Sequence, residues 1–112
     1  MHPALSRIGD PAAEQHARHV LARLESFADG PPRPRRAATA RLDLALALIA
    51  AGRPDEAAGT ALEAVTSGRL VPSSYWRARE AISAVAARGL PEARELAEAY
   101  RAECRELPPA IA

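Results

Sequence analysis

Two glycine–proline junctions most constrain the fold of this chain. Gly52 is followed by Pro54 and Gly89 by Pro91, and the two glycines are 37 residues apart. Glycine is favoured just past the end of a helix, because it adopts positive φ angles without strain, and proline is favoured at the first helical position. Acidic residues follow both prolines, where they stabilise the positive end of a helix dipole. Each junction therefore predicts a tight turn between two antiparallel helices.

The composition indicates that the rest of the chain is helical as well. Of the 112 residues, 28 are alanine, and all 15 basic residues are arginine. Alanine, leucine, glutamate and arginine are strong helix formers. Valine and isoleucine, which favour strands, number only eight together. We therefore expect an all-α protein of about five antiparallel helices, forming a single domain over residues 1–112.

Prolines and helix-capping residues predict where these helices begin and end. Asp10-Pro11 is a start signal, and the run of prolines after Gly30 cannot continue a helix. The expected boundaries are a flexible tail at 1–9, a first helix at 10–28, a proline-rich linker at 29–35, a first hairpin at 36–67 and a second hairpin at 72–106.

The helix that begins near residue 36 is unusually apolar. From Leu44 to Ala51 it contains only leucine, isoleucine and alanine. A helix that is apolar all round must be buried on more than one side. Asp43 immediately precedes this stretch, so we expect its carboxylate to face a groove, water, or an arginine such as Arg41 or Arg79.

The first hairpin resembles a tetratricopeptide repeat. The residues that match that family's leucine-small, aromatic, glycine, alanine, aromatic and alanine signature are Leu44-Ala45, Leu48, Gly52, Ala57, Ala61 and Ala64. The sequence departs from the family where Leu48 replaces a tyrosine, Ala61 a phenylalanine and Arg41 a tryptophan, and the turn of the second hairpin is one residue shorter. Over residues 37–102 the resemblance implies a right-handed stack of helical hairpins.

Two segments, 40–45 and 67–78, also resemble the helical C-terminal domains of actinobacterial regulators that carry an N-terminal helix-turn-helix of the Xre type. This resemblance implies that the chain is the partner-binding or sensing part of a bacterial transcriptional regulator. DNA would then be contacted only through an absent or separate domain, because no recognition-helix pattern is visible in this sequence.

The tetratricopeptide resemblance also implies which residues meet a partner. In such stacks the first helix of each hairpin lines a concave surface on which peptides or helices dock. The expected lining is Leu42, Leu46, Ile49, Trp76, Arg79 and Ser83. Tryptophan and arginine dominate the binding energy at many interfaces, so Trp76 and Arg79 are the expected anchors. The alternative for the three aliphatic residues is that they pack against the first helix as core.

Residues capable of catalysis or metal binding are few and scattered. His16 and His19 could meet one metal ion, but a metal site needs three or four ligands and no second cluster accompanies them. Cys104 lies among charged residues with no histidine in its half of the chain, which indicates an ordinary surface thiol. We therefore expect no catalytic residue, no metal and no cofactor.

The net charge argues against nucleic acid and membrane surfaces as direct partners. The formal charge is +1, and the densest basic cluster, Arg33, Arg35 and Arg36, would give only weak, salt-sensitive phosphate contacts. We favour simple solvation for this cluster. The longest uncharged helical stretch falls far short of a membrane span, so a soluble, cytoplasmic protein is expected.

These patterns predict a non-catalytic protein-interaction or effector-sensing module that binds a peptide, a protein or a small ligand on its concave face. The alternative is a homodimerising helical scaffold without a ligand. It is motivated by the first helix, which has no hairpin partner and would leave an apolar edge.

Overall fold

The computed structural model describes residues 11–26 and 33–106, except the side chains of 105 and 106, and every regular element in these ranges is helical. The elements are α2 (Pro11–Glu25), α3 (Pro34–Ala50), α4 (Pro54–Thr66), the short 3-10 turn η1 (Pro72–Ser74), α5 (Tyr75–Ala87) and α6 (Glu92–Glu106). The expected tail at 1–9 and most of the expected linker lie outside the described residues. The all-α prediction is confirmed.

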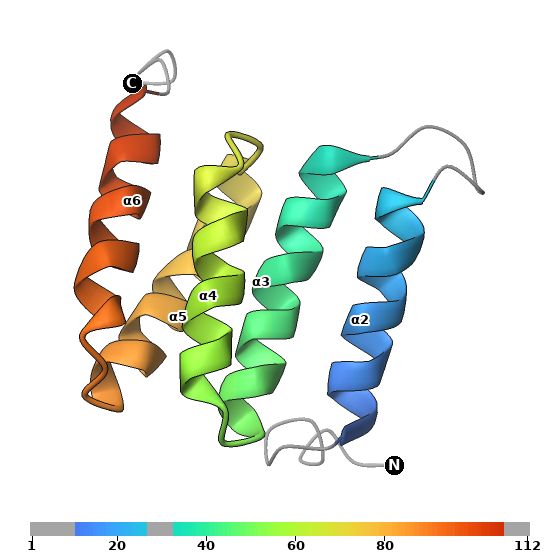
Figure 1. Cartoon of the computed structure of the whole chain (residues 1–112). Coiled ribbons are helices and arrows are strands. Elements are labelled where there is room, and N and C mark those ends of the chain that lie inside the picture. Colours follow the sequence, from blue (N-terminus) through green and yellow to red (C-terminus); the bar gives the residue numbers. More distant parts are fainter. Residues whose placement is uncertain (1–10, 27–32, 107–112) are drawn as a thin grey trace.

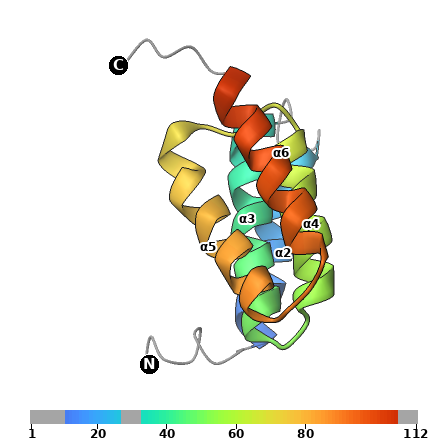
Figure 2. The ribbon, with the colours of Figure 1, turned by 90° about the vertical axis from the view of Figure 1, so that its left-hand side faces the viewer.

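The helices form a row with one helix set behind it. In Figure 1, α6, α4, α3 and α2 follow one another across the view, and α5 lies behind α4. Seen from the α6 side in Figure 2, α5 lies on one side of α3 and α4 on the other. Helix α3 contacts α2, α4 and α5, while α4 also contacts α5 and α6. This central position explains why the sequence of α3 is apolar all round.

The two glycine turns have the same hydrogen-bond pattern. Gly52 has a φ of 81°, and its N–H donates to the Ile49 carbonyl at 3.0 Å, while the next N–H reaches five residues back to Leu48. Gly89 has a φ of 74°, and the N–H of the residue after it likewise reaches five residues back, to Val85. Paired bonds of this kind satisfy the last carbonyls of a helix. Both turns predicted from the glycine–proline junctions are therefore confirmed.

The beginning of α3 lies earlier than the expected hairpin boundary at residue 36. Arg33 is the residue before the helix, and Pro34 occupies the first helical position. Proline fits there because its fixed φ is helical and its missing N–H would have no partner in the first turn. The sequence predicts a proline-rich linker through residue 35, but its last proline, Pro34, is the first residue of the helix.

The core combines a few large aliphatic side chains with many alanines. The largest fully buried apolar residues are Leu42, Leu48, Val65, Val85 and Leu96. Helix α4 buries four alanines, Ala57, Ala58, Ala61 and Ala64, three of them with no exposed surface. Because alanine side chains are short, they let neighbouring helix axes approach closely. The α3–α4 pair is the most extensive contact in the molecule for this reason.

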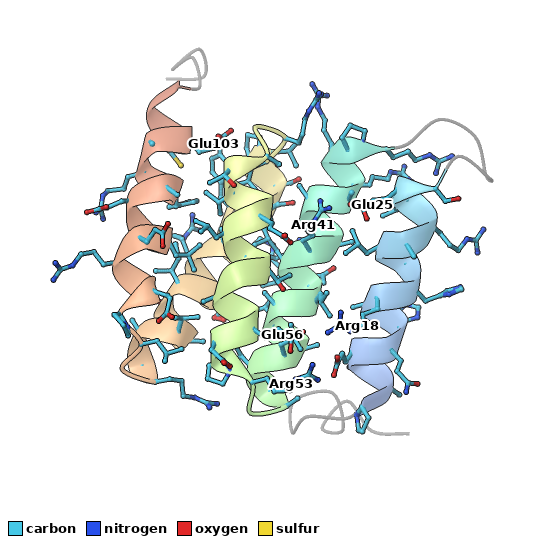
Figure 3. All side chains as sticks on the ribbon, in the orientation of Figure 1. Arg18, Glu25, Arg41, Arg53, Glu56 and Glu103 are labelled. Atoms are coloured by element: carbon cyan, nitrogen blue, oxygen red, sulfur yellow. The ribbon has the colours of Figure 1, made fainter. Side chains whose placement is uncertain are left out.

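Ion pairs link α2 to the beginning of α4 and to Arg53, the residue before it. Arg18 contacts Glu14 and Glu56, both at 2.8 Å, and Arg53 contacts the same two carboxylates at 2.6 Å. Figure 3 shows Arg18, Arg53 and Glu56 directed toward one another between α2 and the start of α4. Arg18, Arg53 and Glu56 are well exposed and Glu14 is half-buried, so the network positions α2 more than it stabilises the fold.

A second group of ion pairs acts at the other end of α2. Arg41 contacts Glu25 at the end of α2, and its Nε lies 3.8 Å from Glu63 on α4. Both groups of ion pairs therefore lie on the face of α3 that is shared with α4. These ion pairs do not cover the opposite face of α3, which points toward α5.

Acidification is expected to release α2. Hydrogen bonds from Arg18 hold the pKa of both Glu14 and Glu56 below the ordinary value of 4.5. Because the folded pKa lies below the unfolded one, this stabilisation is fully present above about pH 4.5 and is lost as the pH falls through the lower folded value. Amide signals of α2, followed by NMR from about pH 6 to about pH 3, should move before those of α4.

The matched variants for this experiment are Glu14→Gln with Glu56→Gln, and Glu98→Gln as the control. The double variant should lose the early transition of α2, because amides do not titrate, and Glu98→Gln should retain it. If α2 keeps its signals until the whole protein unfolds, in both the parent and the control, these ion pairs do not hold the helix.

Candidate partner-binding groove

An open groove lies along α3 between α2 and α5. It encloses about 690 Å³ and is lined mainly by apolar atoms. Leu46 and Ala47 of α3 form part of its floor, Val20 of α2 lies on one wall, and Glu80 of α5 and Arg88 after α5 lie on the other. The wall formed by α2 carries short side chains, Ala13 and Ala17, at helical spacing, so the space between the helices is not filled.

The α5 wall is joined to α3 by two polar contacts. Arg77 Nε donates a hydrogen bond to Asp43 Oδ1 at 2.7 Å, and Arg88 Nη2 donates to the Ile49 carbonyl at 3.3 Å. Asp43 therefore has an arginine partner, as expected, but the partner is Arg77 and not Arg41 or Arg79. Residues 41 and 43 point to nearly opposite sides of the helix, so Arg41 faces α4 when Asp43 faces α5.

The groove continues toward the beginning of α3. A second hollow, of about 360 Å³, shares Val20, Ala40 and Asp43 with the first and extends to Arg35 and Arg36. A third hollow, of about 480 Å³, adjoins it and is lined by Arg33, Pro34, Arg35, Arg36 and Arg69. The three hollows together follow most of the length of α3, from an apolar floor to a strongly basic end.

The three aliphatic residues of the predicted site differ in how far the structure buries them. Leu42 has 0% of its surface exposed, so the expectation that it lines an accessible surface is wrong. It lies at helical spacing from Ala38 and Ala45, which are also buried, because this stripe of α3 faces the core. Leu46 is half-buried on the groove floor. Ile49 is only 8% exposed and also lines the groove.

The three predicted residues on α5 do not line the groove. Trp76 is 48% exposed, and the guanidinium of Arg77 lies over its ring, 4.6 Å from the centroid. Arg79 reaches the other way, toward α6, where its Nη1 donates to the Tyr100 hydroxyl at 3.1 Å. Ser83 is exposed. The six predicted residues therefore do not form one surface, because α5 directs Arg77 and Glu80, and not Trp76 or Arg79, toward α3.

Sequence reasoning missed both walls of the groove. Ala13, Ala17 and Val20 on α2 are part of a stripe that predicts inward packing, and nothing in the periodicity indicates that α2 leaves this face of α3 partly uncovered. Glu80 and Arg88 belong to no sequence motif that would identify them as groove residues. The only available signal is the surplus of apolar surface on α3, which exceeds what one neighbouring hairpin can cover.

The larger hollow of the groove carries few polar side chains. It is lined by one histidine, His16, and by three charged residues, Asp43, Glu80 and Arg88, with no serine, threonine or cysteine among its lining residues. Across the described ranges, no group of three or more histidine, cysteine or acidic side chains is placed to hold a metal ion. His16 and His19 are both exposed.

Cys104 is half-buried and not a surface thiol as expected. It lies close to the Tyr75–Tyr100 pair, whose rings meet edge to face with centroids 5.8 Å apart. Burial raises the pKa of both tyrosines, and the Tyr75 hydroxyl is buried without a hydrogen-bond partner among the described residues. This cluster lies between α5 and α6, away from the groove.

The fold and the groove together define an all-helical domain with an open, partly apolar groove that ends at an arginine cluster. No protein family, no curated protein and no solved structure was found to match the chain. Within residues 11–26 and 33–106, none of the helices has the length and apolar character needed to cross a membrane.

Proposed function

We propose that this chain is a non-catalytic interaction module, related to tetratricopeptide repeats, that holds a peptide segment of a partner protein in the groove along α3. The observation that carries the proposal is the groove itself, with its apolar floor at Leu46 and its two helical walls. A groove between helices can accept an amphipathic helix or an extended segment with its apolar side chains inward.

The relation to tetratricopeptide repeats is supported by the repeated turn. The α3–α4 and α5–α6 pairs have glycine turns with the same hydrogen-bond pattern, and the second pair packs on the first through α4 as well as α3. A shorter second turn is accommodated because Ala93 and Arg94 at the start of α6 donate three residues back, to Leu90 and Pro91. The separate resemblance of segments 40–45 and 67–78 to domains of Xre-type regulators further supports a place in a bacterial transcriptional regulator whose DNA-binding domain is separate.

A peptide fits the groove better than a small effector. The volume of the larger hollow falls within the range of small-ligand pockets. Such pockets are mostly concave and enclose their ligand, whereas this groove is open along one side and continues past Asp43 into the second hollow. An elongated ligand can occupy both hollows, which a compact small molecule cannot do.

Peptides selected from a displayed library test the proposal. The selected peptides should shift the NMR amide signals of residues that line the groove, and Leu46→Glu should weaken their binding at least about tenfold, or about 1.4 kcal/mol. Leu62→Glu is the matched control, because Leu62 is also a half-buried leucine but lies on α4, outside the groove. Circular dichroism establishes that both variants are folded.

Two outcomes contradict the groove. One is that selected peptides bind Leu46→Glu as well as they bind the parent chain. The other is that the peptide-induced shifts cluster around Trp76 on the outer face of α5.

Homodimerisation is the second candidate function. It is favoured by Trp76, the one large apolar side chain that is exposed among the described residues, which a second copy of the chain could cover. Light scattering over a dilution series, done alongside the peptide titrations, decides this point. A mass that stays at one chain at every concentration removes the dimeric scaffold.

A further inference from the structure

Four arginines surround the hollow at the beginning of α3. Arg33, Arg35 and Arg36 come from the start of that helix, and Arg69 comes from the connection between α4 and η1. All four residues are exposed, and Pro34 is the one other residue that lines this open hollow of about 480 Å³. The first turn of α3 contains no acidic residue. The hollow therefore brings together residues that are far apart in the sequence and carry the same charge.

These arginines differ from the other arginines that link the helices. Arg18, Arg41, Arg53 and Arg77 each contact at least one carboxylate. Within the described part of the chain, the side chains of the four arginines around the hollow have no ion pair and no hydrogen bond. Like charges placed together without a counter-charge repel, so the arrangement favours an anion supplied from outside. Guanidinium groups hold carboxylates in a fixed, two-pronged geometry.

We propose that this arginine hollow binds the acidic residues of the same peptide segment whose apolar residues occupy the groove. The inference rests on the proposed function, because it specifies the chemistry of that partner. Arg35 and Arg36 line both the arginine hollow and the neighbouring hollow that contains Val20 and Ala40. A continuous ligand thus passes directly from the basic end to the apolar floor.

Charge distribution favours an acidic peptide over a nucleic acid. A nucleic-acid strand carries a phosphate at every nucleotide and needs a positive track along its whole path. Beyond Arg36 the groove presents mainly apolar side chains, the carboxylates of Asp43 and Glu80, and a single arginine, Arg88. Repeated phosphates would therefore meet no continuous positive track, whereas a peptide can change from acidic to apolar side chains along its length.

The geometry also sets the spacing of the expected motif. Arg36 and Leu46 are ten residues apart on one helix, which corresponds to roughly 15 Å along its axis. An extended peptide covers that distance in about four to five residues at roughly 3.3 Å per residue. The expected partner segment therefore carries acidic residues about four to five positions from its first apolar anchor when it binds in an extended form.

Synthetic peptides provide the test with the full chain. The probe contains four glutamates, a short glycine-serine spacer and three leucines, and it is compared with a version in which lysines replace the glutamates. The glutamate probe should shift amide signals at residues 35–37 and 69–70 together with those of the groove, and it should bind at least about tenfold more tightly than the lysine version. Its affinity should fall as the salt concentration rises.

Matched arginine variants test whether this affinity comes from the arginine hollow. Arg35→Gln combined with Arg69→Gln should weaken the glutamate probe at least about tenfold. Arg94→Gln combined with Arg101→Gln removes the same charge from exposed positions on α6 and should leave binding unchanged. If both pairs weaken the probe equally, the attraction is a general charge effect and the inference is overturned.

The remaining outcomes separate this inference from the groove proposal. If Leu46→Glu abolishes binding of the probe while the Arg35/Arg69 variant binds normally, the groove is a binding site and the acidic specificity is wrong. If a peptide of four glutamates alone binds as tightly as the whole probe, the groove contributes nothing and both proposals fail. A single-stranded oligonucleotide that binds these arginines more tightly than the glutamate probe also overturns the inference.

Discussion

Replacing Leu42 by alanine is expected to lower the free energy of unfolding by about 2–5 kcal/mol. The side chain has no exposed surface and belongs to the core shared by the helices around α3. Its removal loses buried apolar area and leaves a cavity that the surrounding alanines cannot fill. Small domains are stable by only about 5–15 kcal/mol, so the loss is a large share of the total. Urea denaturation followed by circular dichroism measures it.

Leu46→Ala is the matched comparison on the same helix. Leu46 is half-buried and faces the groove, so its truncation exposes little new surface and should cost much less stability than Leu42→Ala. Equal losses for the two variants would place Leu46 in the core and remove the floor of the proposed groove. The pair therefore tests the division of α3 into a core stripe and a groove stripe.

Replacing Ala61 by phenylalanine is expected to destabilise the protein by about 1–3 kcal/mol. Ala61 has no exposed surface and lies on α4, which packs closely on α3. A phenylalanine there would have to push the helices apart or distort its own rotamer. The tetratricopeptide family usually has phenylalanine at the matching position, so the result shows whether the α3–α4 pair is packed more tightly than the family resemblance implies. The midpoint of thermal unfolding reports the change.

Ala87→Phe is the control for the added ring. Ala87 is exposed in the last turn of α5, so a phenylalanine there meets no packed neighbour and should leave the melting temperature almost unchanged. A stabilising Ala61→Phe would mean that the space between α3 and α4 accommodates an aromatic ring, contrary to the packing described above.

Local sequence rules were sufficient for the presence of the helices and for the glycine turns, but not for every helix boundary. Gly52 and Gly89 have the positive φ angles that their position before a proline predicts. The apolar stretch of α3 predicts burial on several sides, and three neighbouring helices provide it. Such features depend on residues close together in the sequence, and their physical chemistry does not require knowledge of the whole fold.

The groove depends on contacts between distant residues and was not predictable in the same way. Glu14 and Arg53, 39 residues apart, meet only after α2 has packed on α3. The periodicity of a sequence shows which side of a helix is apolar. It does not show how that helix is rotated about its axis when it packs against two neighbouring helices. Trp76 illustrates the limit, because its residue type suggests a binding anchor while the rotation of α5 directs it away from the groove.

The position of α2 determines the width of the groove, because this helix forms one of the groove's two walls. This helix packs mainly on α3, and its ion pairs join the half-buried carboxylate of Glu14 to the exposed side chains of Arg18 and Arg53. A ligand seated against Val20 also clamps α2, so occupancy and helix docking are thermodynamically linked. If the proposed peptide binds in this groove, its affinity is expected to depend on ionic strength and acidity through the ion pairs of α2, even where those ion pairs do not touch the peptide.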